Sequence, residues 1–385
     1  SSIGVVGAGT MGTGIAQIAS TYGHIVYLYD AFPNQLKTSE AGLISILNRQ
    51  VEKERMTQNE VNEILGRIHF VEHTVDFKKC DIVFEAIVED LQAKKDQFAR
   101  LEGILSKNCI LATNTSSLSI ASISSGLKKP GRLLGIHFFN PAPLMNLVEI
   151  IPGISTESKT TQEARSLIDK WEKTTVLAKD TPGFIVNRVA RPFYGEALRI
   201  YEEGIADHAT IDWAMKELGG FKMGPFELMD LIGHDVNYKV TESVFKEFYY
   251  DPRFKPSFAQ KRLVEAGRLG KKSGLGFYDY RDNAKNTEPT RDKKLGEKIL
   301  YRILALLINE AADAVFMNVA TVKDVDLAML NGVNYPKGLL KWADELGVQR
   351  VLDWISALHV EYREDRYRPN PLLKRKVKNN ETFYE

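Results

Sequence analysis

A histidine and a carboxylate stand inside a stretch of the sequence that is otherwise apolar. The segment RLLGIHFFNPAPLMNLVEI (132–150) contains His137 and, twelve residues later, Glu149. A buried carboxylate is costly unless it is paired or hydrogen-bonded. A carboxylate that binds one ring nitrogen of a histidine fixes the tautomer and raises the basicity of the other nitrogen. The pair therefore predicts a general base, with a purely structural His–Glu pair as the alternative.

The residues around this pair indicate how the chain places it. Residues 132–138 and 146–150 have the pattern of two strands on either side of the turn NPAPLMN. If these strands are neighbours, His137 and Glu149 come into contact. The second ring nitrogen then takes a proton from a substrate hydroxyl, and this is general-base catalysis.

Polar side chains flank the pair along the sequence. Ser116, in TNTSSLSI (113–120), follows a predicted strand at the sheet edge where ligands of doubly wound folds bind. Asn140 lies in the Pro-rich turn, and Asn187 lies further along the chain. These three residues are candidates for binding a substrate oxygen as it changes between alcohol and ketone. A helix N-cap is an equally good interpretation of Ser116.

A glycine-rich motif predicts a dinucleotide site. GAGTMG (7–12) directly follows a predicted strand and directly precedes a predicted helix. Gly7 permits a tight turn, Gly9 lets the backbone approach a pyrophosphate, and Gly12 lets the helix pack closely on the strand. Asp30 ends the second strand, where an acid binds a ribose 2′-hydroxyl and repels a 2′-phosphate, so we expect NAD rather than NADP. The expected cofactor site also contains Thr10, Met11 and Asn114.

The first 181 residues alternate strand and helix patterns. Strands are predicted at 3–8, 24–30, 80–87 and 109–114, and helices at 11–22, 33–53 and 90–106. This alternation predicts an α/β Rossmann-type domain with a mainly parallel sheet over residues 1–181. After Pro182 and Gly183 the strand signals almost vanish, apart from one short candidate at GFYDY (276–280).

The helical remainder of the sequence repeats itself. The matching segments are 187–215 with 301–329, aligned without a gap, and 224–233 with 335–347, aligned with a small gap. A repeat of this length predicts two all-α domains related by internal duplication, at 182–280 and 281–385. Asn187 of the first copy corresponds to Tyr301 of the second, so the copies are not chemically equivalent.

The composition argues against several classes of function. The net charge is +1, which provides no global field for nucleic acid or acidic lipid. We expect the basic segment KRKVKNN (374–380) to be a solvated tail. No apolar run has the length of a membrane span, the first residues enter a strand without a signal peptide, and no metal site is expected. Cys80 and Cys109 are predicted to be buried, reduced thiols in a cytoplasmic protein.

Taken together, the motifs resemble those of the L-3-hydroxyacyl-CoA dehydrogenases. The matching segments are GAGTMGTGIAQ, FEAIVEDLQAKK, TNTSSLSI, GIHFFNPAPLMNLVEI and DTPGFIVNRV. They occur in order across residues 1–280, and the second helical copy extends the resemblance to residue 385. A duplicated C-terminal domain also occurs in the dehydrogenase part of multifunctional β-oxidation enzymes and in stand-alone bacterial relatives. The chain is similar to the stand-alone, 3-hydroxybutyryl-CoA dehydrogenase-like form.

The resemblance implies a role for each matched position. His137 corresponds to the catalytic base and Glu149 to its partner. The residues that correspond to those holding the substrate oxygen or the base are Ser116, Asn140 and Asn187. Asp30 matches the acid that binds the ribose, Glu85 and Lys94 match positions that line the cofactor site, and Lys53 falls near a lysine that meets the CoA phosphate. For Lys53, a solvated surface lysine is the preferred interpretation.

The implied activity is the reversible NAD-dependent oxidation of (S)-3-hydroxyacyl-CoA to 3-ketoacyl-CoA in fatty acid or related acyl-CoA metabolism. Two other hypotheses remain open: a dehydrogenase of free 3-hydroxy acids or sugar acids, and a non-catalytic NAD-binding structural protein. In single-copy relatives two chains pair through the helical domain. Here the second copy is expected to supply that surface within one chain, which makes a monomeric pseudo-dimer the working hypothesis and leaves a homo-oligomer open.

Overall fold

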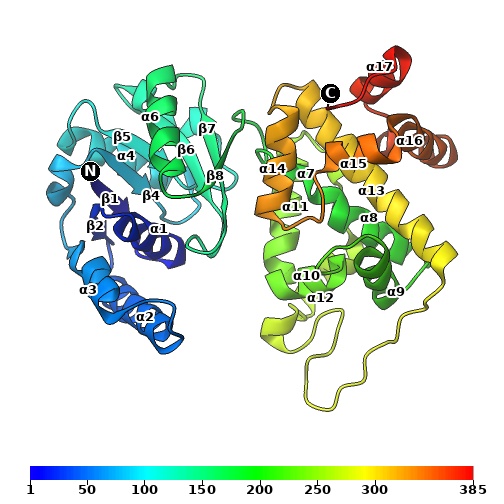
Figure 1. Cartoon of the computed structure of the whole chain (residues 1–385), viewed down its shortest axis with the longest axis horizontal. Helices are drawn as coiled ribbons and strands as arrows, with labels where there is room; N and C mark the ends of the chain where they lie inside the picture. Colours follow the sequence, from blue (N-terminus) through cyan, green and yellow to red (C-terminus); the bar gives the residue numbers. More distant parts are fainter. Residues whose placement is uncertain (385) are drawn as a thin grey trace. The chain divides into compact units, whose positions relative to one another are not determined.

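The computed structural model describes residues 1–384. These residues form two compact units, one at Ser1–Thr181 and one that begins at Pro182 (Figure 1). The first unit is built on a single eight-stranded sheet in the order β3-β2-β1-β4-β5-β6-β7-β8. The strands are β1 (Ser2–Val6), β2 (Ile25–Tyr29), β3 (Ile68–Val71), β4 (Ile82–Glu85), β5 (Ile110–Thr113), β6 (Leu133–Phe138), β7 (Leu147–Pro152) and β8 (Thr174–Leu177). Every neighbouring pair is parallel except β6 and β7, which the Pro-rich turn joins as an antiparallel pair.

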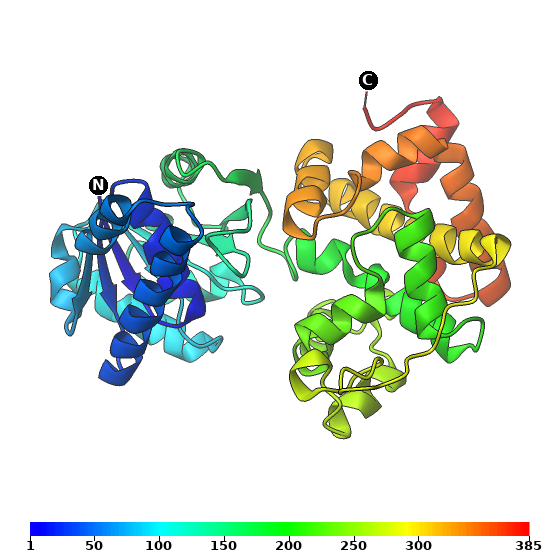
Figure 2. The same cartoon turned by 60° about the horizontal axis from the view of Figure 1, so that its bottom comes forward.

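Helices cover the sheet in front and behind (Figure 2). They are α1 (Thr10–Thr21), α2 (Pro33–Glu52), α3 (Gln58–Gly66), α4 (Leu91–Ile104), α5 (Ile120–Ser124) and α6 (Ser158–Asp169), with short 3₁₀ segments η1 (Thr74–Lys79) and η2 (Pro130–Arg132). The sequence sets several of their starts: Pro33 occupies the first turn of α2, and the Asp90 side chain accepts a bond from the Ala93 N–H at the start of α4. The predicted Rossmann-type arrangement is confirmed.

Two features of the chain, one in each unit, differ from the sequence-based expectation. β3 is an additional strand at the sheet edge, paired only with β2. The segment GFYDY forms isolated bridges at Leu275 instead of a strand. Its backbone N–H groups at Phe277 and Tyr278 donate to the Asp230 carboxylate at 3.0 and 2.9 Å, so they are not available to a strand partner.

The second unit is helical. Its helices are α7 (Val186–Val189), α8 (Arg191–Glu202), α9 (His208–Trp213), α10 (Pro225–Ile232), α11 (His234–Glu247), α12 (Phe258–Glu265), α13 (Lys293–Phe316), α14 (Val322–Gly332), α15 (Leu339–Leu346), α16 (Val348–Tyr362) and α17 (Pro371–Asn379), with a π-helical turn η3 (Ala214–Leu218) and short 3₁₀ segments η4 (Pro252–Phe254), η5 (Lys271–Ser273) and η6 (Asp365–Tyr367). The long helix α13 is the centre of this unit and contacts α7, α8, α9, α14, α15, α16 and α17 (Figure 1).

The basic segment near the C-terminus is solvated as expected, since most of residues 374–380 are exposed, but it is a helix and not an irregular tail. It forms most of α17, which buries Leu373. The chain beyond α17 is also attached, because Phe383 N and Tyr384 N donate to the Asp344 carboxylate at 2.8 and 2.9 Å.

Buried carboxylates show the duplication at the level of single bonds. Asp212 accepts from the backbone N–H groups of Phe226 and Glu227. Asp326, 114 positions later, accepts in the same way from Leu340 and Lys341, which are also 114 positions later. The expectation of a small gap between the repeat segments is therefore wrong, since the two copies keep the same offset through α10 and α15.

The two copies also contact each other reciprocally. Arg188 Nε donates to Glu310 Oε1 at 2.8 Å, and Arg302 Nε donates to Glu196 Oε1 at 2.5 Å. Arg302 lies 114 positions after Arg188, and Glu310 lies 114 positions after Glu196. Each arginine of one copy thus pairs with the glutamate of the other, as across the two-fold axis of an isologous dimer.

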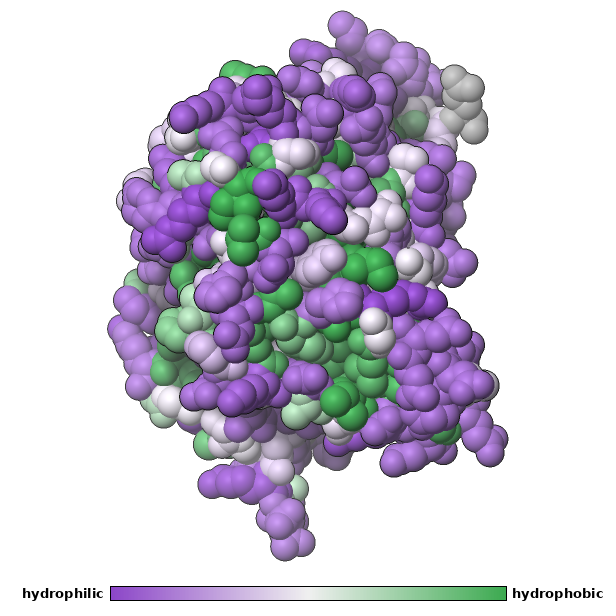
Figure 3. All heavy atoms as spheres, turned by 90° about the vertical axis from the view of Figure 1, so that its left-hand side faces the viewer, coloured by the Kyte–Doolittle hydropathy of each residue, from purple (hydrophilic) through white to green (hydrophobic). Residues whose placement is uncertain are grey.

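No described helix combines the length and the apolar character that a membrane span requires. The face in Figure 3 is mostly hydrophilic and has a hydrophobic area in its middle.

Candidate active site

The glycine loop between β1 and α1 has the geometry that a dinucleotide requires. Gly7 has φ +101°, and a Cβ there would lie 2.4 Å from Ala86 O. A Cβ at Gly12 would lie 1.7 Å from Gly7 O, so only glycine lets α1 pack this closely on β1. A Cβ at Gly9 would meet no atom within 4 Å, so this side of the loop faces open space.

The N-terminus of α1 has the features of an anion-binding site. No side chain caps its N-terminus at Gly9, so the N–H groups of the first turn are left for another acceptor. Thr10 is exposed in this turn, and Met11 packs partly against the hydrophobic core. Backbone N–H groups at a helix N-terminus bind phosphate.

Asp30 lies beside this loop at the carboxyl end of β2. Its Oδ2 accepts from Ala8 N at 2.8 Å, and its Oδ1 accepts from Phe32 N at 2.9 Å. These bonds hold the carboxylate against the glycine loop, which is where a ribose hydroxyl would meet it. The residues present therefore fit NAD.

Glu85 and Lys94, which the resemblance matches to positions that line the cofactor site, are buried and paired with each other. Glu85 is 0% exposed and Lys94 is 1% exposed, and Lys94 Nζ lies 2.6 Å from Glu85 Oε1. Glu85 also accepts from the Thr113 hydroxyl at 2.7 Å and from Ile87 N at 2.8 Å. The strand pattern of β4 explains this burial, because Glu85 is its last residue and all four positions of that strand are buried.

Glu89 is a site residue that the sequence reasoning missed. Its Oε1 accepts from the Thr115 hydroxyl at 2.5 Å, Ser116 N at 2.9 Å and Ser117 N at 3.2 Å, and its Oε2 lies 3.2 Å from Lys94 Nζ. Burial alone would raise the pKa of Glu89, but the Lys94 charge and the bonds from Thr115 and Ser116 outweigh it, and the pKa is lowered. Glu89 is thus a carboxylate that holds the loop after β5.

A signal for Glu89 was present in the sequence. Glu85 stands inside a strand pattern, whereas Glu89 stands in the turn after that strand, at the carboxyl edge of the sheet. Ligands of doubly wound sheets bind outside this edge. An acid in such a turn is therefore a better site candidate than an acid within the strand.

The loop after β5 also separates two interpretations of Ser116. The N-cap of α5 is Ser119, whose side chain accepts from Ser122 N. Ser116 precedes this cap and donates its backbone N–H to Glu89, so the helix N-cap interpretation is excluded. Asn114, expected at the cofactor site, accepts from Phe138 N at 2.8 Å through its Oδ1, and this bond ties the loop to the strand that carries His137.

The His–Glu pair is formed as predicted. In the antiparallel β6–β7 register His137 is directly opposite Glu149, and His137 Nδ1 lies 2.7 Å from Glu149 Oε2. His137 is 6% exposed and Glu149 is 1% exposed. The ring of Phe139 packs 4.4 Å from the imidazole. Because Nδ1 bonds to the Glu149 carboxylate, proton transfer between this histidine and a bound substrate would use Nε2.

The remaining predicted residues lie on other elements. Asn140 is exposed, two residues beyond the end of β6. Lys53 is exposed at the C-cap of α2. Asn187 belongs to α7 of the second unit, where its backbone carbonyl accepts from Arg191 Nε at 2.8 Å.

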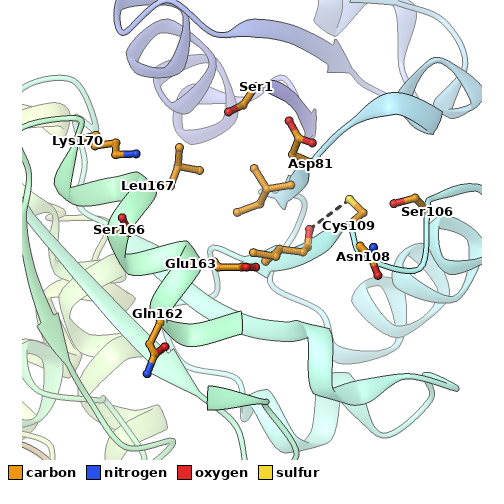
Figure 4. Close-up of a pocket in the computed structure, with 12 residues that line it drawn as sticks. Ser1, Asp81, Ser106, Asn108, Cys109, Gln162, Glu163, Ser166, Leu167 and Lys170 are labelled. Atoms are coloured by element: carbon orange, nitrogen blue, oxygen red, sulfur yellow. Dashed lines mark hydrogen bonds between the residues drawn. The ribbon is translucent and has the colours of Figure 1, made fainter. Parts of the chain in front are cut away.

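A hollow of about 530 Å³ in the first unit lies at the opposite edge of the sheet (Figure 4). Its lining includes Asp81 and Cys109, which precede β4 and β5, and thus it faces the amino ends of the parallel strands. Burial raises the pKa of the Cys109 thiol to about 12, which leaves it protonated and unreactive at neutral pH. The hollow therefore does not belong to the site formed by the glycine loop and the His–Glu pair.

A parallel sheet with this glycine loop, a ribose-binding acid and a histidine–carboxylate pair defines an NAD-dependent dehydrogenase that acts on a hydroxyl group. Comparison with known families agrees. Residues 2–181 match the family model described as 3-hydroxyacyl-CoA dehydrogenase, NAD binding domain. Residues 183–280 and, separately, 299–383 match the C-terminal domain of the same enzymes, so both helical copies are recognised. The chain belongs to the 3-hydroxyacyl-CoA dehydrogenase family and is an NAD-dependent enzyme of that family.

Relatives of known name cover the chain to different extents. The 3-hydroxyadipyl-CoA dehydrogenase of Escherichia coli K12 is 36% identical over 98% of this chain and 97% of its own length. A probable 3-hydroxybutyryl-CoA dehydrogenase of Bacillus subtilis is 41% identical over 72% of this chain and 96% of its own. The crystal structure of 3-hydroxybutyryl-CoA dehydrogenase from Escherichia coli K12 superimposes with a TM-score of 0.94 at 36% identity, covering 98% of both chains.

Proposed function

We propose that His137 is the general base in the oxidation of (S)-3-hydroxyacyl-CoA to 3-ketoacyl-CoA. The proton of the 3-hydroxyl group moves to Nε2 of His137 as the hydrogen on C3 leaves as hydride. Bound NAD would accept this hydride and become NADH. The observation that carries the proposal is the buried bond of 2.7 Å between His137 Nδ1 and Glu149 Oε2. The Glu149 carboxylate orients the ring and stabilises the imidazolium that forms.

We infer that the glycine loop and Asp30 hold the cofactor, with the pyrophosphate at the start of α1 and the ribose at Asp30. Thr10 and Met11 belong to the same turn. Glu89 and the buried Glu85–Lys94 pair support the loop that carries Asn114 and Ser116. The ionised Glu89 carboxylate accepts hydrogen bonds from the backbone N–H and the hydroxyl of Ser116. These bonds hold Ser116 in one position.

We also propose that Ser116, Asn140 and Asn187 bind the substrate oxygen or the base. Hydroxyl and amide groups donate to an oxygen that gains negative charge during ketone reduction. Lys53 is proposed as a contact of a CoA phosphate, supported by its exposed position at the end of α2.

The quaternary state is proposed to be a monomeric pseudo-dimer. The reciprocal pairs Arg188–Glu310 and Arg302–Glu196 support this, since they occupy equivalent positions in the two copies within one chain. Sedimentation equilibrium at assay concentration measures the mass, and a mass of two chains contradicts the proposal. A cytoplasmic location is proposed with it, supported by the two unpaired, buried thiols Cys80 and Cys109.

The test of the function is the consumption of NADH with acetoacetyl-CoA, followed by the absorbance of the reduced nicotinamide. Parallel reactions contain NADPH or free acetoacetate. We expect rapid loss of NADH with the thioester only. Loss of NADH with the free acid but not with the thioester overturns the acyl-CoA assignment, and turnover by a His137→Gln variant at the wild-type rate overturns the assigned base.

A further inference from the structure

Arg191 is a buried cation for which the described residues provide no carboxylate partner. Four arginines of the described chain are buried: Arg132, Arg188, Arg191 and Arg366. The other three each have a carboxylate oxygen within 4.0 Å, whereas none of the described residues provides one for Arg191. A buried charge without a counter-charge is strongly destabilising, so an anion bound at Arg191 would stabilise this part of the helical unit.

The guanidinium is held in place but not saturated. Nε donates to Asn187 O at 2.8 Å, and Nη1 donates to the Thr241 hydroxyl at 3.0 Å. The group stacks over the ring of Tyr194, with Cζ 5.0 Å from the ring centroid. A guanidinium carries five N–H donors, so three of them have no partner among the described residues. A planar fork of this kind binds a carboxylate through two parallel bonds.

A second buried polar group lies in the same helical unit, on the chain between α14 and α15. The hydroxyl of Tyr335 is fully buried and has no hydrogen-bond partner among the described residues, and the residue is 5% exposed. The Tyr335 ring packs against the ring of Phe193, two residues after Arg191, with the ring centroids 5.7 Å apart. The charge of Arg191 also opposes the rise that burial causes in the pKa of Tyr335. A buried hydroxyl without a partner is rare and costly, and a carboxylate oxygen is an acceptor that satisfies it.

Arg191 is one helical turn away from Asn187, which we assigned to the substrate oxygen. Ala190, in the right-handed helical conformation, joins α7 to α8, so Asn187 and Arg191 are residues i and i+4 of one helical path. Such residues lie on the same face, about 6 Å apart along the axis. Three C–C bonds beyond the hydroxylated carbon extend about 4 Å, and a charge-assisted bond adds about 2.8 Å. The spacing suits a carboxylate whose carbon atom is the third beyond C3, that is, C6 of the acyl chain.

We propose that Arg191, with the hydroxyl of Tyr335, binds the terminal carboxylate of a dicarboxylic 3-hydroxyacyl-CoA with a six-carbon acyl chain. This inference rests on the proposed function, because it requires that the reacting carbon lies at Asn187. Of the acyl groups in the names of the relatives, the hydroxyadipyl group has this structure and the hydroxybutyryl group does not. The sequence alone did not identify this cation.

The first measurement compares two substrates on the unmodified chain. They are 3-hydroxyadipyl-CoA and 3-hydroxyhexanoyl-CoA, which have equal chain length and differ in the terminal group. We expect kcat/KM to favour the dicarboxylic thioester by about 10²-fold or more, because a site built to bind a polar group discriminates strongly against its absence. Equal values, or a preference for the hexanoyl thioester, overturn the proposal.

The second measurement repeats this comparison on variants. Arg191→Met is expected to lower the ratio of the two kcat/KM values by about 30-fold or more, and Arg191→Lys by less, because it keeps the charge but loses the fork. Tyr335→Phe removes one hydroxyl and is expected to lower the ratio by about 3- to 10-fold. Arg366→Met is the matched control, since it removes a buried arginine that has a carboxylate partner, and its ratio should equal that of the unmodified chain.

The outcomes separate this inference from the proposed function. Equal losses on both substrates in folded Arg191→Met, judged by circular dichroism, show a structural role and overturn the carboxylate site. If Arg191→Met does not fold, the ratio in the unmodified chain and in Tyr335→Phe decides. Failure of the unmodified chain to turn over either thioester contradicts the proposed function itself.

Discussion

Replacing Glu149 by glutamine tests the charge in the His–Glu pair while keeping its shape. His137 Nδ1 and Glu149 Oε2 are 2.7 Å apart, which places the centres of the two charged groups about 4 Å apart in the imidazolium state. At an effective dielectric constant of about 20, this attraction is about 4 kcal/mol. The amide oxygen of glutamine still accepts the Nδ1 hydrogen, so the ring keeps its orientation. Since about 1.4 kcal/mol corresponds to a factor of ten in rate, we expect kcat to fall by about 10²- to 10³-fold.

The assay is NADH oxidation with saturating acetoacetyl-CoA, alongside a fluorescence titration of NADH and a thermal melt. NADH affinity should stay within about twofold of the unmodified chain, because the cofactor contacts are elsewhere. Glu102→Gln is the control: Glu102 is a partly buried carboxylate of the same unit that lies 3.6 Å from Arg132, and its loss should lower stability without changing kcat. A kcat of folded Glu149→Gln within tenfold of the unmodified value would refute the argument that the charge is needed.

Three further changes follow from other contacts. Asp30→Asn should weaken NADH binding by about 10- to 100-fold, because a charge-assisted bond to the ribose is lost; unchanged affinity in a fluorescence titration removes Asp30 from the ribose site. Arg302→Met should lower the free energy of unfolding by about 3–5 kcal/mol in urea, since it leaves Glu196, which is 2% exposed, without its nearest cation; a loss below about 1 kcal/mol contradicts this. Asp212 should make unfolding pH-dependent, because burial raises its pKa from 3.8 to about 7 despite the bonds it accepts. The folded chain then binds this proton more tightly than the unfolded chain, so the contribution is complete below pH 3.8 and is lost as the pH rises to about 7. Three pKa units correspond to about 4 kcal/mol, and urea titrations at about pH 5 and pH 8 should show a smaller difference for Asp212→Asn than for the unmodified chain.

The parts of the site that depend on local sequence pattern were predictable. Gly7 and Gly12 stand at fixed positions in a strand–turn–helix unit, and the structure leaves no room for a side chain at either. His137 and Glu149 occupy two short strands joined by one turn, and the alternation of the strands is enough to predict that they meet. Each of these inferences involves residues that are close in the sequence or in one repeated motif.

The parts that depend on long-range packing were not predictable. Glu89 becomes a site residue only because the loop after β5 folds over it, 26 to 28 residues away. The edge strand β3 has four residues and one partner strand, so its pattern is weak. GFYDY has strand-like composition, but a carboxylate from a distant helix takes its N–H groups. Nothing in the sequence around Arg191 distinguishes it from an exposed helix arginine, and only the structure shows that it is buried.

The reciprocal ion pairs show that the two copies of the helical domain form a dimer-like interface within one chain, and this affects which substitutions each copy tolerates. In a homodimer every substitution occurs twice and must be tolerated at both symmetric positions. In one chain the two positions mutate independently, so a residue can be retained where chemistry needs it and replaced where only packing is needed. The role that we propose for Asn187 fits this division, because its counterpart Tyr301 stacks on Trp354 with ring centroids 4.5 Å apart. The covalent link also keeps the second copy at a fixed effective concentration near the first, so dilution cannot separate the two copies.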